Sequence, residues 1–494
     1  MLLSVLTACV LAQDPPVEAT SPVEAAEPAV VERRPVEVNG YLSSRTTYSR
    51  SRVSGLIATD DMPQVSELLE LNAQLKIPYA RGSFVYADAS ALLSVAGGYR
   101  GINNAGDEVV LPSKDVSQVR PAFVLSELYL LHEFAPQFNA LVGKKRINWG
   151  PGFAFSPTDL LNIRDPTDPT AQRNGAWLVR AELPFEFFTL SAVFAPTVTK
   201  SVAGLPQAML LYPEWDKKDS EAHYQLAARL YALLWDSDVN VMFFWGNKSV
   251  DAFATKPRVG VTFSRYFFSD YELHVDALFQ SGSTRDYVNE TCVKSTAAAL
   301  DCALRETVPI SKARLNDPAI LPRVLVGSRY QFPDESLLSV EYLYQADGYS
   351  QAEFTALVQG LQLLKDAKAL GIPANLLPAA PGAASQADGT PQRFNFDPAR
   401  RHYLFISYQK TRIFDDFTAQ LVTLVNLEDL SSLWTPSVSW SATEWLTLSA
   451  FGFIPVRGLD SLGVRVASAS GAYVTEYSNI PFAARVMFEA RVFY

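Results

Sequence analysis

The sequence predicts an all-β protein: a transmembrane antiparallel up-and-down β-barrel of about 18 strands, with short periplasmic turns and long extracellular loops. Three observations carry this prediction. Segments of alternating apolar and polar residues recur along the chain, their connections alternate between short and long, and the last segment has one wholly apolar face. A membrane protein without long apolar helices must close its sheet, because open strand edges cannot be hydrogen-bonded in lipid.

The beginning of the chain differs in composition from the rest. Residues 1–12 are apolar and end on small residues, which predicts a cleaved secretory signal peptide and export of the mature chain. The sequence Leu6-Thr7-Ala8-Cys9 also resembles a lipobox, so a lipid on Cys9 is the alternative. Residues 13–35 are rich in Pro, Ala, Glu and Val, which predicts a flexible periplasmic segment. The barrel is expected over residues 36–494.

Each predicted strand has an apolar face and a polar face. Leu69 and Leu71, for example, alternate with Glu70 and Asn72, which is the period of a strand whose two faces meet different surroundings. Most segments reach the roughly 9–11 residues that a tilted strand needs to cross a bilayer. The predicted strands are 36–48, 66–77, 83–97, 121–134, 138–147, 174–183, 186–196, 221–235, 238–248, 257–268, 270–281, 321–332, 335–347, 399–411, 416–426, 432–442, 444–456 and 482–494.

The connections are sorted by length. Short turns such as 135–137 and 236–237 alternate with segments that are mostly long, such as 148–173 and 348–398. A soluble sandwich has no reason to sort its loops in this way, whereas an outer-membrane barrel has short turns on its periplasmic side. The pattern therefore predicts a location in the bacterial outer membrane, with the outer-membrane lipids as the surroundings of the barrel.

The last predicted strand sets the orientation of its two faces. A basic residue that faces lipid near the midplane costs roughly 2–4 kcal/mol, so the face with Arg485 and Arg491 is expected to line the lumen. The opposite face is expected to meet lipid, with Tyr494 at the periplasmic interface. This ending also resembles the C-terminal signal by which outer-membrane proteins reach the barrel assembly machinery. The apolar face consists of Phe482, Ala484, Val486, Phe488, Ala490 and Val492.

The most distinctive stretch is LSELYLLHEFAPQFNALVGKKRINWGPGFAFSPTDLLNIRDPTDP, residues 125–169. It resembles a motif of porin-like families that include the alginate-export and capsule-assembly groups, although Lys145 stands where those families usually have Gln. The resemblance implies a channel and, more specifically, polysaccharide export with envelope export components as partners. The matching residues are Glu127, Tyr129, Gly143, Arg146, Trp149, Gly150, Pro157, Asp159, Asn162, Asp165 and Pro166.

Two roles are open for this stretch. Glu127 can pair with Lys145 or Arg146 across neighbouring strands, so the motif could lock a hairpin in register. Alternatively, the loop at 148–173 could fold into the barrel mouth and contribute to selectivity.

Candidate pore-lining or constriction residues follow from the alternation of faces. The inward charges nearly balance, so no strong ion selectivity is expected, and ion-pair ladders compete with a substrate track as their role. The candidates are Glu127, Lys145, Arg146, Trp149, Arg229, Glu272, His274, Asp276, Arg323, Arg329, Arg485, Glu489 and Arg491.

A helix is predicted inside the connection at 348–398. Ser350 and Glu353 have the spacing of a capping box, and apolar residues follow at helical spacing from Phe354. The helix could be a lid or plug over the pore, or it could lie across the crown of the loops.

Other function classes have little support in the sequence. Cys292 and Cys302 lie ten residues apart in a polar segment, which predicts a disulfide formed in an oxidising compartment. The net charge of -10 argues against a nucleic-acid partner, and the sequence has no metal, nucleotide or hydrolase motif, so no cofactor and no enzymatic activity are expected. We expect a channel for passive or gated passage of polar solutes or polysaccharide. The alternative is a non-conducting barrel that serves as a surface scaffold and binds a glycan or another partner.

Overall fold

The structure is a computed structural model, and it describes most of the predicted barrel strands and parts of their connections. No helix among the described residues is long and apolar enough to span a bilayer. The described residues are 35–52, 64–97, 100–102, 108–110, 118–161, 175–196, 199–201, 211–213, 224–246, 257–283, 287–288, 298, 310–311, 318–358, 399–456, 458, 475–477 and 482–494.

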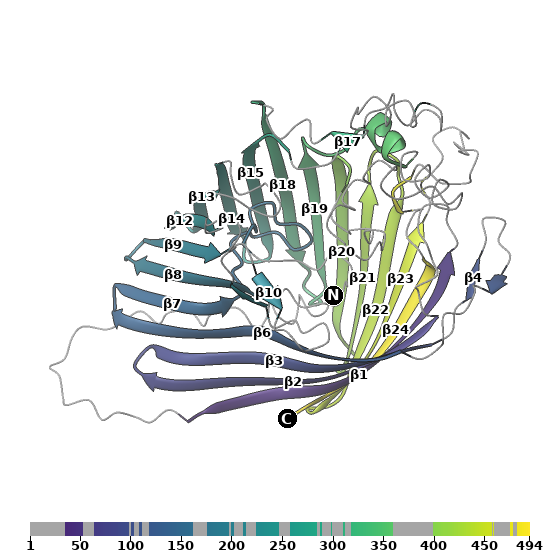
Figure 1. Cartoon of the computed structure of the whole chain (residues 1–494), viewed down its shortest axis with the longest axis horizontal. Helices are drawn as coiled ribbons and strands as arrows, with labels where there is room; N and C mark the ends of the chain where they lie inside the picture. Colours follow the sequence, from purple (N-terminus) through teal and green to yellow (C-terminus); the bar gives the residue numbers. More distant parts are fainter. Residues whose placement is uncertain are drawn as a thin grey trace.

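Eighteen antiparallel strands form one closed barrel (Figure 1). Each strand pairs with the next one along the barrel, and β1 pairs with β24 to close it. The strands are β1 (Glu37–Arg52), β2 (Val65–Ala80), β3 (Ser83–Gly97), β6 (Gln118–Ala135), β7 (Phe138–Lys145), β8 (Ala176–Pro184), β9 (Phe188–Pro196), β12 (Tyr224–Leu234), β13 (Ser237–Gly246), β14 (Arg258–Phe267), β15 (Tyr271–Ser281), β18 (Ile320–Gln331), β19 (Leu337–Gln345), β20 (His402–Ile413), β21 (Phe417–Asn426), β22 (Ser432–Thr443), β23 (Leu446–Val456) and β24 (Phe482–Phe493).

The predicted fold class and strand count are confirmed. Every predicted strand coincides with a barrel strand, although several ends differ by a few residues. The remaining short strands lie in the connections: β4 (Arg100–Ile102) with β5 (Glu108–Val110), β10 (Thr199–Ser201) with β11 (Leu211–Pro213), and β16 (Tyr287–Val288) with β17 (Ile310–Ser311).

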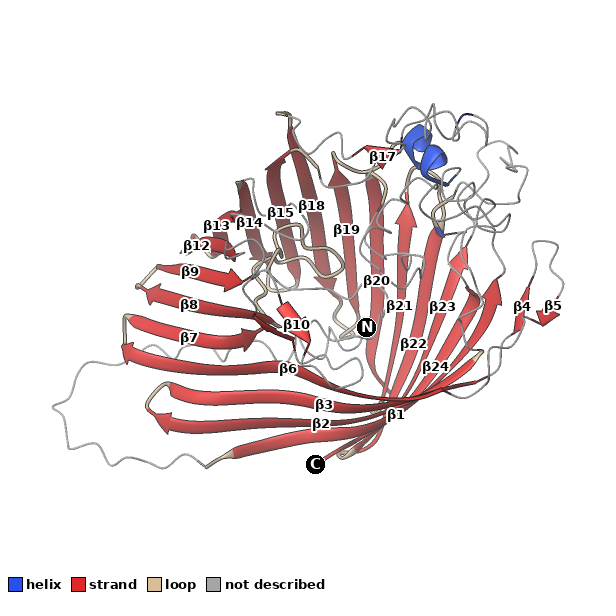
Figure 2. Ribbon diagram, in the orientation of Figure 1, coloured by secondary structure: helices blue, strands red, loops and turns tan. Residues whose placement is uncertain are grey.

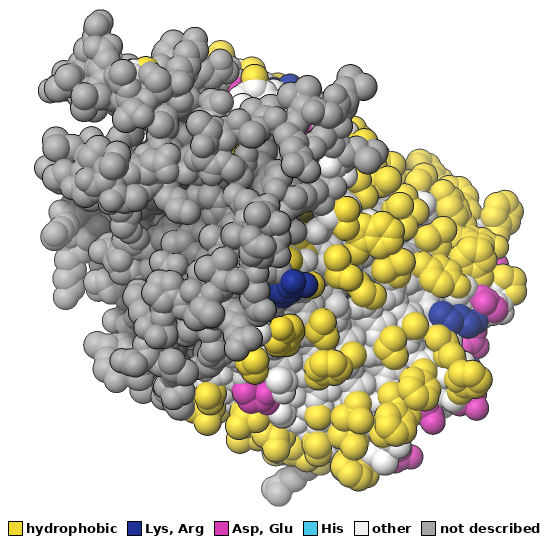
Figure 3. All heavy atoms as spheres, turned by 90° about the vertical axis from the view of Figure 1, so that its right-hand side faces the viewer, with side chains coloured by type: hydrophobic (Ala, Val, Ile, Leu, Met, Phe, Trp, Pro, Cys, Tyr) yellow, Lys and Arg dark blue, Asp and Glu magenta, His cyan; other side chains and the backbone are white. Residues whose placement is uncertain are grey.

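The outer face of the barrel is apolar. Leu71 on β2, Val142 on β7 and Phe488 on β24 are 50%, 51% and 58% exposed, whereas their neighbours along each strand point inward. Hydrophobic side chains cover much of the described part of the face drawn in Figure 3. A protein surface of this kind is stable only when lipid covers it.

Exposed aromatic residues mark the end of the barrel where the short turns lie. Trp235, Phe268 and Phe414 are 85–93% exposed and occupy turn positions with φ of 50–54°. A positive φ is strained for an aromatic residue, and turns of this kind favour Asn or Gly there. An aromatic girdle at the membrane interface explains why aromatic residues stand in such positions. The exposed aromatics at this end include Tyr79, Phe134, Phe185, Phe187, Trp235, Tyr266, Phe268, Phe414, Trp445, Phe493 and Tyr494.

One detail differs from expectation. Phe482, expected on the lipid-facing side of β24, is 2% exposed and belongs to an interior apolar cluster. The register of β1 against β24 shifts between Arg50 and Ser51, opposite Phe482, and this shift interrupts the alternation of faces. The connection at 427–431 is short on the side of the long loops, as the predicted strand ends imply.

Candidate functional site: an inward loop bound to the barrel wall

The chain leaves the wall at the end of β7 through a locally irregular hairpin. Gly143 has a φ of 137°, and a Cβ there would lie 2.7 Å from the Cα of Tyr129 on β6. The register of β3 against β6 shifts between Asp88 and Ala89, and Lys144 Nζ donates a hydrogen bond to the carbonyl oxygen of Leu125 at 2.5 Å. Gly143 is therefore required by close packing and by its φ.

Glu127 and Asp88 hold the first residue beyond β7. The backbone N–H of Arg146 donates to Glu127 at 2.8 Å, and its guanidinium donates to Asp88 at 2.8 Å. Lys145 instead places its Nζ 4.3 Å from the ring centre of Tyr129. Glu127 thus contacts Arg146, one of the two partners considered for it. A role of this contact as a hairpin lock stays a prediction.

Residues 146–161, termed here the inward loop, lie within the ring of strands (Figure 2, tan segment in front of β15 and β18). Two interior apolar clusters receive the loop. Trp149 packs 5.9 Å from the ring of Phe244 on β13, and Phe155 packs 6.0 Å from the ring of Tyr403 on β20. The loop therefore runs along the inner wall from β13 to β20.

Glu341 on β19 binds the middle of the inward loop. Its two carboxylate oxygens accept hydrogen bonds from the backbone N–H groups of Phe153 at 2.6 Å and Ala154 at 2.9 Å. Glu341 is fully buried. These two hydrogen bonds give the backbone N–H groups of the loop an acceptor and give the buried carboxylate two donors. Both are needed, because buried backbone donors and buried charges are costly without partners.

Asp276 on β15 binds the loop at a second place. One carboxylate oxygen accepts from Ser156 Oγ at 3.0 Å and from Thr158 Oγ1 at 3.1 Å. A Cβ at Gly150 would lie 2.4 Å from the same carboxylate, so the loop needs a glycine to approach the wall this closely.

His274 and two charged neighbours surround the Glu341 contact. His274 Nε2 lies 3.1 Å from Glu341, and its Nδ1 lies 3.6 Å from Glu272. The guanidinium of Arg329 lies 3.6 Å from Glu272 and 3.6 Å from the ring centre of Phe153. The fold thus brings wall candidates to the inward loop that carries Trp149. These wall candidates are Glu272, His274, Asp276 and Arg329.

Other candidates form ion pairs along the inner wall. Arg323 Nη2 lies 2.6 Å from Asp347, and Glu489 accepts from Arg45 at 3.0 Å and from Arg491 at 2.9 Å. These contacts match the ion-pair ladders considered for the inward charges. A role of these residues in lining a solute path stays a prediction.

Two further candidates contact neutral groups. Arg485 Nε donates to Ser49 at 3.1 Å, and its guanidinium lies 4.4 Å from the ring centre of Phe482. Arg229 donates to Asn240 at 2.7 Å and lies 6.0 Å from the ring centre of Trp149. Arg229 therefore contacts the inward loop from the β12 side.

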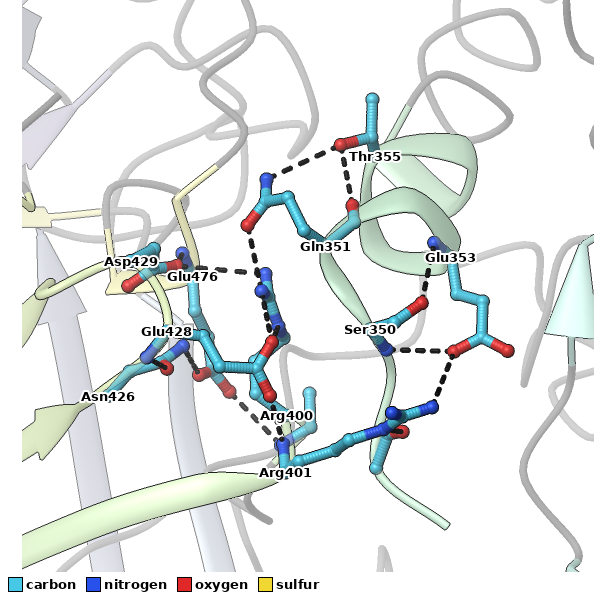
Figure 4. A network of polar contacts seen from close by, with 12 residues as sticks. Ser350, Gln351, Glu353, Thr355, Arg400, Arg401, Asn426, Glu428, Asp429 and Glu476 are labelled. Carbon is cyan, nitrogen blue, oxygen red and sulfur yellow. Dashed lines mark hydrogen bonds and ion pairs between the residues drawn. The ribbon is translucent and has the colours of Figure 1, made fainter. Parts of the chain in front are cut away.

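A second polar cluster, the rim cluster, joins the long-loop ends of several strands (Figure 4). At its centre is Arg400, which is fully buried and which lies 2.6 Å from Glu428 and 3.9 Å from Asp429. Its guanidinium also donates to Gln351 at 2.8 Å and lies 4.9 Å from the ring centre of Phe354. The sequence analysis missed this residue: it placed Arg400 inside the predicted strand 399–411, whereas β20 begins at His402 and Arg400 lies in the connection before it.

Glu476 completes the rim cluster from the connection between β23 and β24. It accepts hydrogen bonds from the hydroxyl of Tyr403 at 2.6 Å, from Asn426 at 2.9 Å and from the N–H of Ala399 at 3.1 Å. Burial, with a smaller contribution from the charge of Asp429, raises the pKa of Glu476 to about 7, although the hydrogen bonds from Tyr403 and Ala399 and the charge of Arg400 act to lower it.

The predicted helix cap is confirmed. Residues 351–358 are helical in the described part of this connection. The backbone N–H of Ser350 donates to Glu353 at 2.8 Å, and the N–H of Glu353 donates to Ser350 Oγ at 3.4 Å. The helix packs at the rim through Phe354 and Val358, which are 1% and 2% exposed. Contact with the rim cluster agrees with a helix at the crown of the loops, and a role as lid or plug stays a prediction.

Several predictions fall outside the described residues. These are the signal peptide and lipobox with Cys9, the segment 13–34, the disulfide between Cys292 and Cys302, and the motif residues Asn162, Asp165 and Pro166. Within the described part of the chain, no three His, Cys, Asp or Glu side chains are grouped so that they could hold a metal ion.

Comparison with known proteins finds similar barrels and no family. No protein-family model and no curated protein matches the chain. The chain is similar to OccK7 (OpdD) of Pseudomonas aeruginosa, with 8% identity over 93% of this chain and 99% of that chain, and a TM-score of 0.48. OccAB3 of Acinetobacter baumannii covers the same shares at 8% identity and a TM-score of 0.44. The outer membrane protein opdK of Pseudomonas aeruginosa covers them at 8% identity and a TM-score of 0.45.

Identities and scores this low assign the chain to no family, and its architecture rests on its own strand pairing. The comparisons do not support the resemblance to the alginate-export and capsule-assembly families. The protein is nevertheless a barrel of the bacterial outer membrane. It is closed, it has an even number of antiparallel strands and an apolar outer face, and an aromatic girdle marks the end with the short turns.

Proposed function

We propose that this protein is a porin-like channel through which polar solutes cross the outer membrane. The carrying observation is the inward loop, which two buried wall carboxylates, Glu341 and Asp276, bind inside an 18-stranded barrel. A barrel of this size encloses more space than its own wall side chains fill, so a loop bound inside it narrows the remaining passage. Outside the two apolar clusters, the described inner face carries many polar side chains, and several of its charges form ion pairs, such as Arg323 with Asp347 and Arg45 with Glu489. Such a lining favours polar solutes without a strong preference for one sign of charge.

Single-channel recording in a planar bilayer tests the proposal. The full chain is compared with a variant in which residues 150–158 are replaced by a short Gly-Ser linker. We expect stable conductance steps for the natural sequence and steps roughly twofold larger or more for the variant, because the constriction is lost. Trp235→Ser at an exposed turn serves as a control and is expected to leave the step size unchanged.

A non-conducting barrel that acts as a surface scaffold or glycan-binding protein is the second candidate, favoured by the ordered rim cluster. Silence of both the natural and the loop-replaced barrel, with folding verified by heat-modifiable migration in gels, would favour the scaffold and contradict the channel. Polysaccharide as the permeant is a finer proposal that rests on the motif at 125–169 alone, and envelope export components are its implied partners. Assembly through the C-terminal strand by the barrel assembly machinery is proposed for either function.

A further inference from the structure

Tyr403 on β20 contacts both the inward loop and the rim cluster. Its side chain is fully buried. The centre of its ring lies 6.0 Å from that of Phe155 in the inward loop. Its hydroxyl donates to Glu476 at 2.6 Å and accepts from the backbone N–H of Arg400 at 2.7 Å. One side chain therefore joins two connections that leave the barrel wall far apart in the sequence.

Phe155 lies between the polar contacts that attach the inward loop to the wall. The N–H of Ala154 donates to Glu341 at 2.9 Å, and Ser156 Oγ donates to Asp276 at 3.0 Å. Phe155 itself is 7% exposed and packs in an interior apolar cluster. Because these three residues are consecutive, a displacement of Phe155 also displaces the donors on either side of it.

Residues 475–477, in the connection between β23 and β24, reach the same apolar cluster from the rim. Tyr477 is 5% exposed and belongs to this cluster. The N–H of Glu476 donates to Asp429 at 2.8 Å, and the N–H of Tyr477 donates to Ser431 Oγ at 3.2 Å. The segment is therefore bound to the neighbouring connection at the rim as well as to β20.

The two hydrogen bonds of the hydroxyl hold the Tyr403 ring in its place. A buried phenol needs an acceptor for its proton, and Glu476 provides it. Protein interiors are close-packed, so a ring that shifts either displaces the side chains packed on it or leaves a cavity. Loss of Glu476 from its place therefore changes the support of Phe155 through the Tyr403 ring.

We propose that Tyr403 is a positioning residue of this channel, which couples the rim to the constriction. Its hydroxyl is held by Glu476 and its ring holds Phe155, so displacement of residues 475–477 loosens the inward loop and widens the passage. The inference rests on the proposed channel function. Coupling of this kind travels through packed side chains and hydrogen bonds that are in direct contact.

The test measures attachment of the inward loop without relying on current. Ala154→Cys is introduced into a full chain whose native cysteines are replaced by serine, and its labelling rate with a water-soluble maleimide is measured at constant pH. Ser269→Cys at an exposed turn provides the reference rate, because it reports the reactivity of a freely accessible thiol. The ratio of the two rates rises when the inward loop leaves the wall.

A double-mutant cycle tests the coupling. Glu476→Ala removes the acceptor of the hydroxyl, and Tyr403→Phe removes the hydroxyl while keeping the ring. Each change alone is expected to raise the ratio roughly fivefold, which is the effect of one net hydrogen bond. The double variant is expected to give the same ratio as the single variants, because both changes break one connection, whereas independent effects would multiply.

Two further variants serve as controls. Glu476→Gln keeps an oxygen that accepts the hydroxyl, so its ratio should stay near that of the natural sequence. Arg401→Ala removes the ion pair of 3.6 Å with Glu353 at the same rim and leaves the partners of Tyr403 in place, so it should not change the ratio. If Tyr403→Phe does not fold, Phe155→Leu takes its place, and it should abolish the response to Glu476→Ala.

The outcomes separate this inference from the channel itself. Ratios that multiply in the double variant, or an unchanged ratio in Glu476→Ala, would overturn the role of Tyr403 even if the barrel conducts. Equal ratios in the single and double variants, with a low ratio in Glu476→Gln, support it. Absence of current in every variant would refute the channel, and the labelling ratios would still decide whether Tyr403 joins the rim to the loop.

Discussion

The inward loop and the rim cluster are built around buried charges of opposite sign. At the inward loop, the wall supplies the buried charges, Glu341 and Asp276, and the loop brings neutral backbone N–H and hydroxyl donors to them. At the rim, a buried cation, Arg400, lies at the centre, and the connections bring carboxylates and a side-chain amide to it. The contact of the inward loop thus depends on the position of its backbone, whereas the contact at the rim depends on the charges of side chains.

This difference determines how each region tolerates change. A neutral donor lost from the inward loop leaves other donors on the same carboxylate, whereas loss of Arg400 leaves Glu428 and Asp429 close together without their shared cation. Removing one partner of a buried charge pair is costly because the remaining charge is uncompensated. The rim should therefore be the more sensitive region to single charge changes.

The largest expected effect is that of Arg400→Met. We expect a loss of about 3–5 kcal/mol in the free energy of unfolding, because buried carboxylates at the rim lose their cation. The urea midpoint of the detergent-solubilised barrel measures it. Arg412→Ala is the control: its side chain is 71% exposed and pairs with Glu335 on the opposite end, so a change of at most about 0.5 kcal/mol is expected. A loss below about 1 kcal/mol for Arg400→Met would remove the contrast between the two regions.

The next effect concerns the pH dependence of the rim. The pKa of Glu476 is about 7 in the folded chain against an ordinary 4.5, so the folded rim binds a proton more tightly than the unfolded one. Stability from this group is complete below pH 4.5 and is lost as pH rises through 7, and it amounts to on the order of 3 kcal/mol.

Limited proteolysis near residues 475–477 from pH 4 to 8 measures this dependence. Cleavage should accelerate as pH rises in the natural sequence and should be constant in Glu476→Gln, whose amide does not ionise. Acceleration with pH that persists in Glu476→Gln would contradict the assignment of this dependence to Glu476.

The smallest effect concerns the helix at the rim, because the inward loop, residues 146–161, contains no helix. Ser350→Ala removes the hydroxyl that caps the helix at 351–358 and is expected to cost about 1 kcal/mol. Hydrogen exchange of the amides at 352–356 measures it, with Thr355→Ala as a control within the same helix. Unchanged protection in Ser350→Ala would mean that packing of Phe354 against Arg400 alone maintains the helix.

Local patterns were sufficient for most of the barrel and for the cap. Leu71 and Asn72 face lipid and interior as their alternation predicts, because a strand repeats every two residues whatever surrounds it. Ser350 and Glu353 cap the helix because both partners lie within one turn. Phe482 was placed wrongly because a register shift with β1, a distant strand, reverses the local alternation.

The sequence by itself determined that this chain closes an 18-stranded barrel with a lipid-facing side. Strand period and turn length are local properties of the sequence, and a sheet in lipid must close because its edges cannot be hydrogen-bonded there. Only the tertiary structure decided that Phe153 meets Glu341, that His274 and Glu272 flank this contact, and that Arg400 is enclosed by Glu428 and Asp429. These pairs join residues that are distant along the chain. Which residues pair depends on burial and charge compensation in the folded interior, and a local sequence pattern does not predict it.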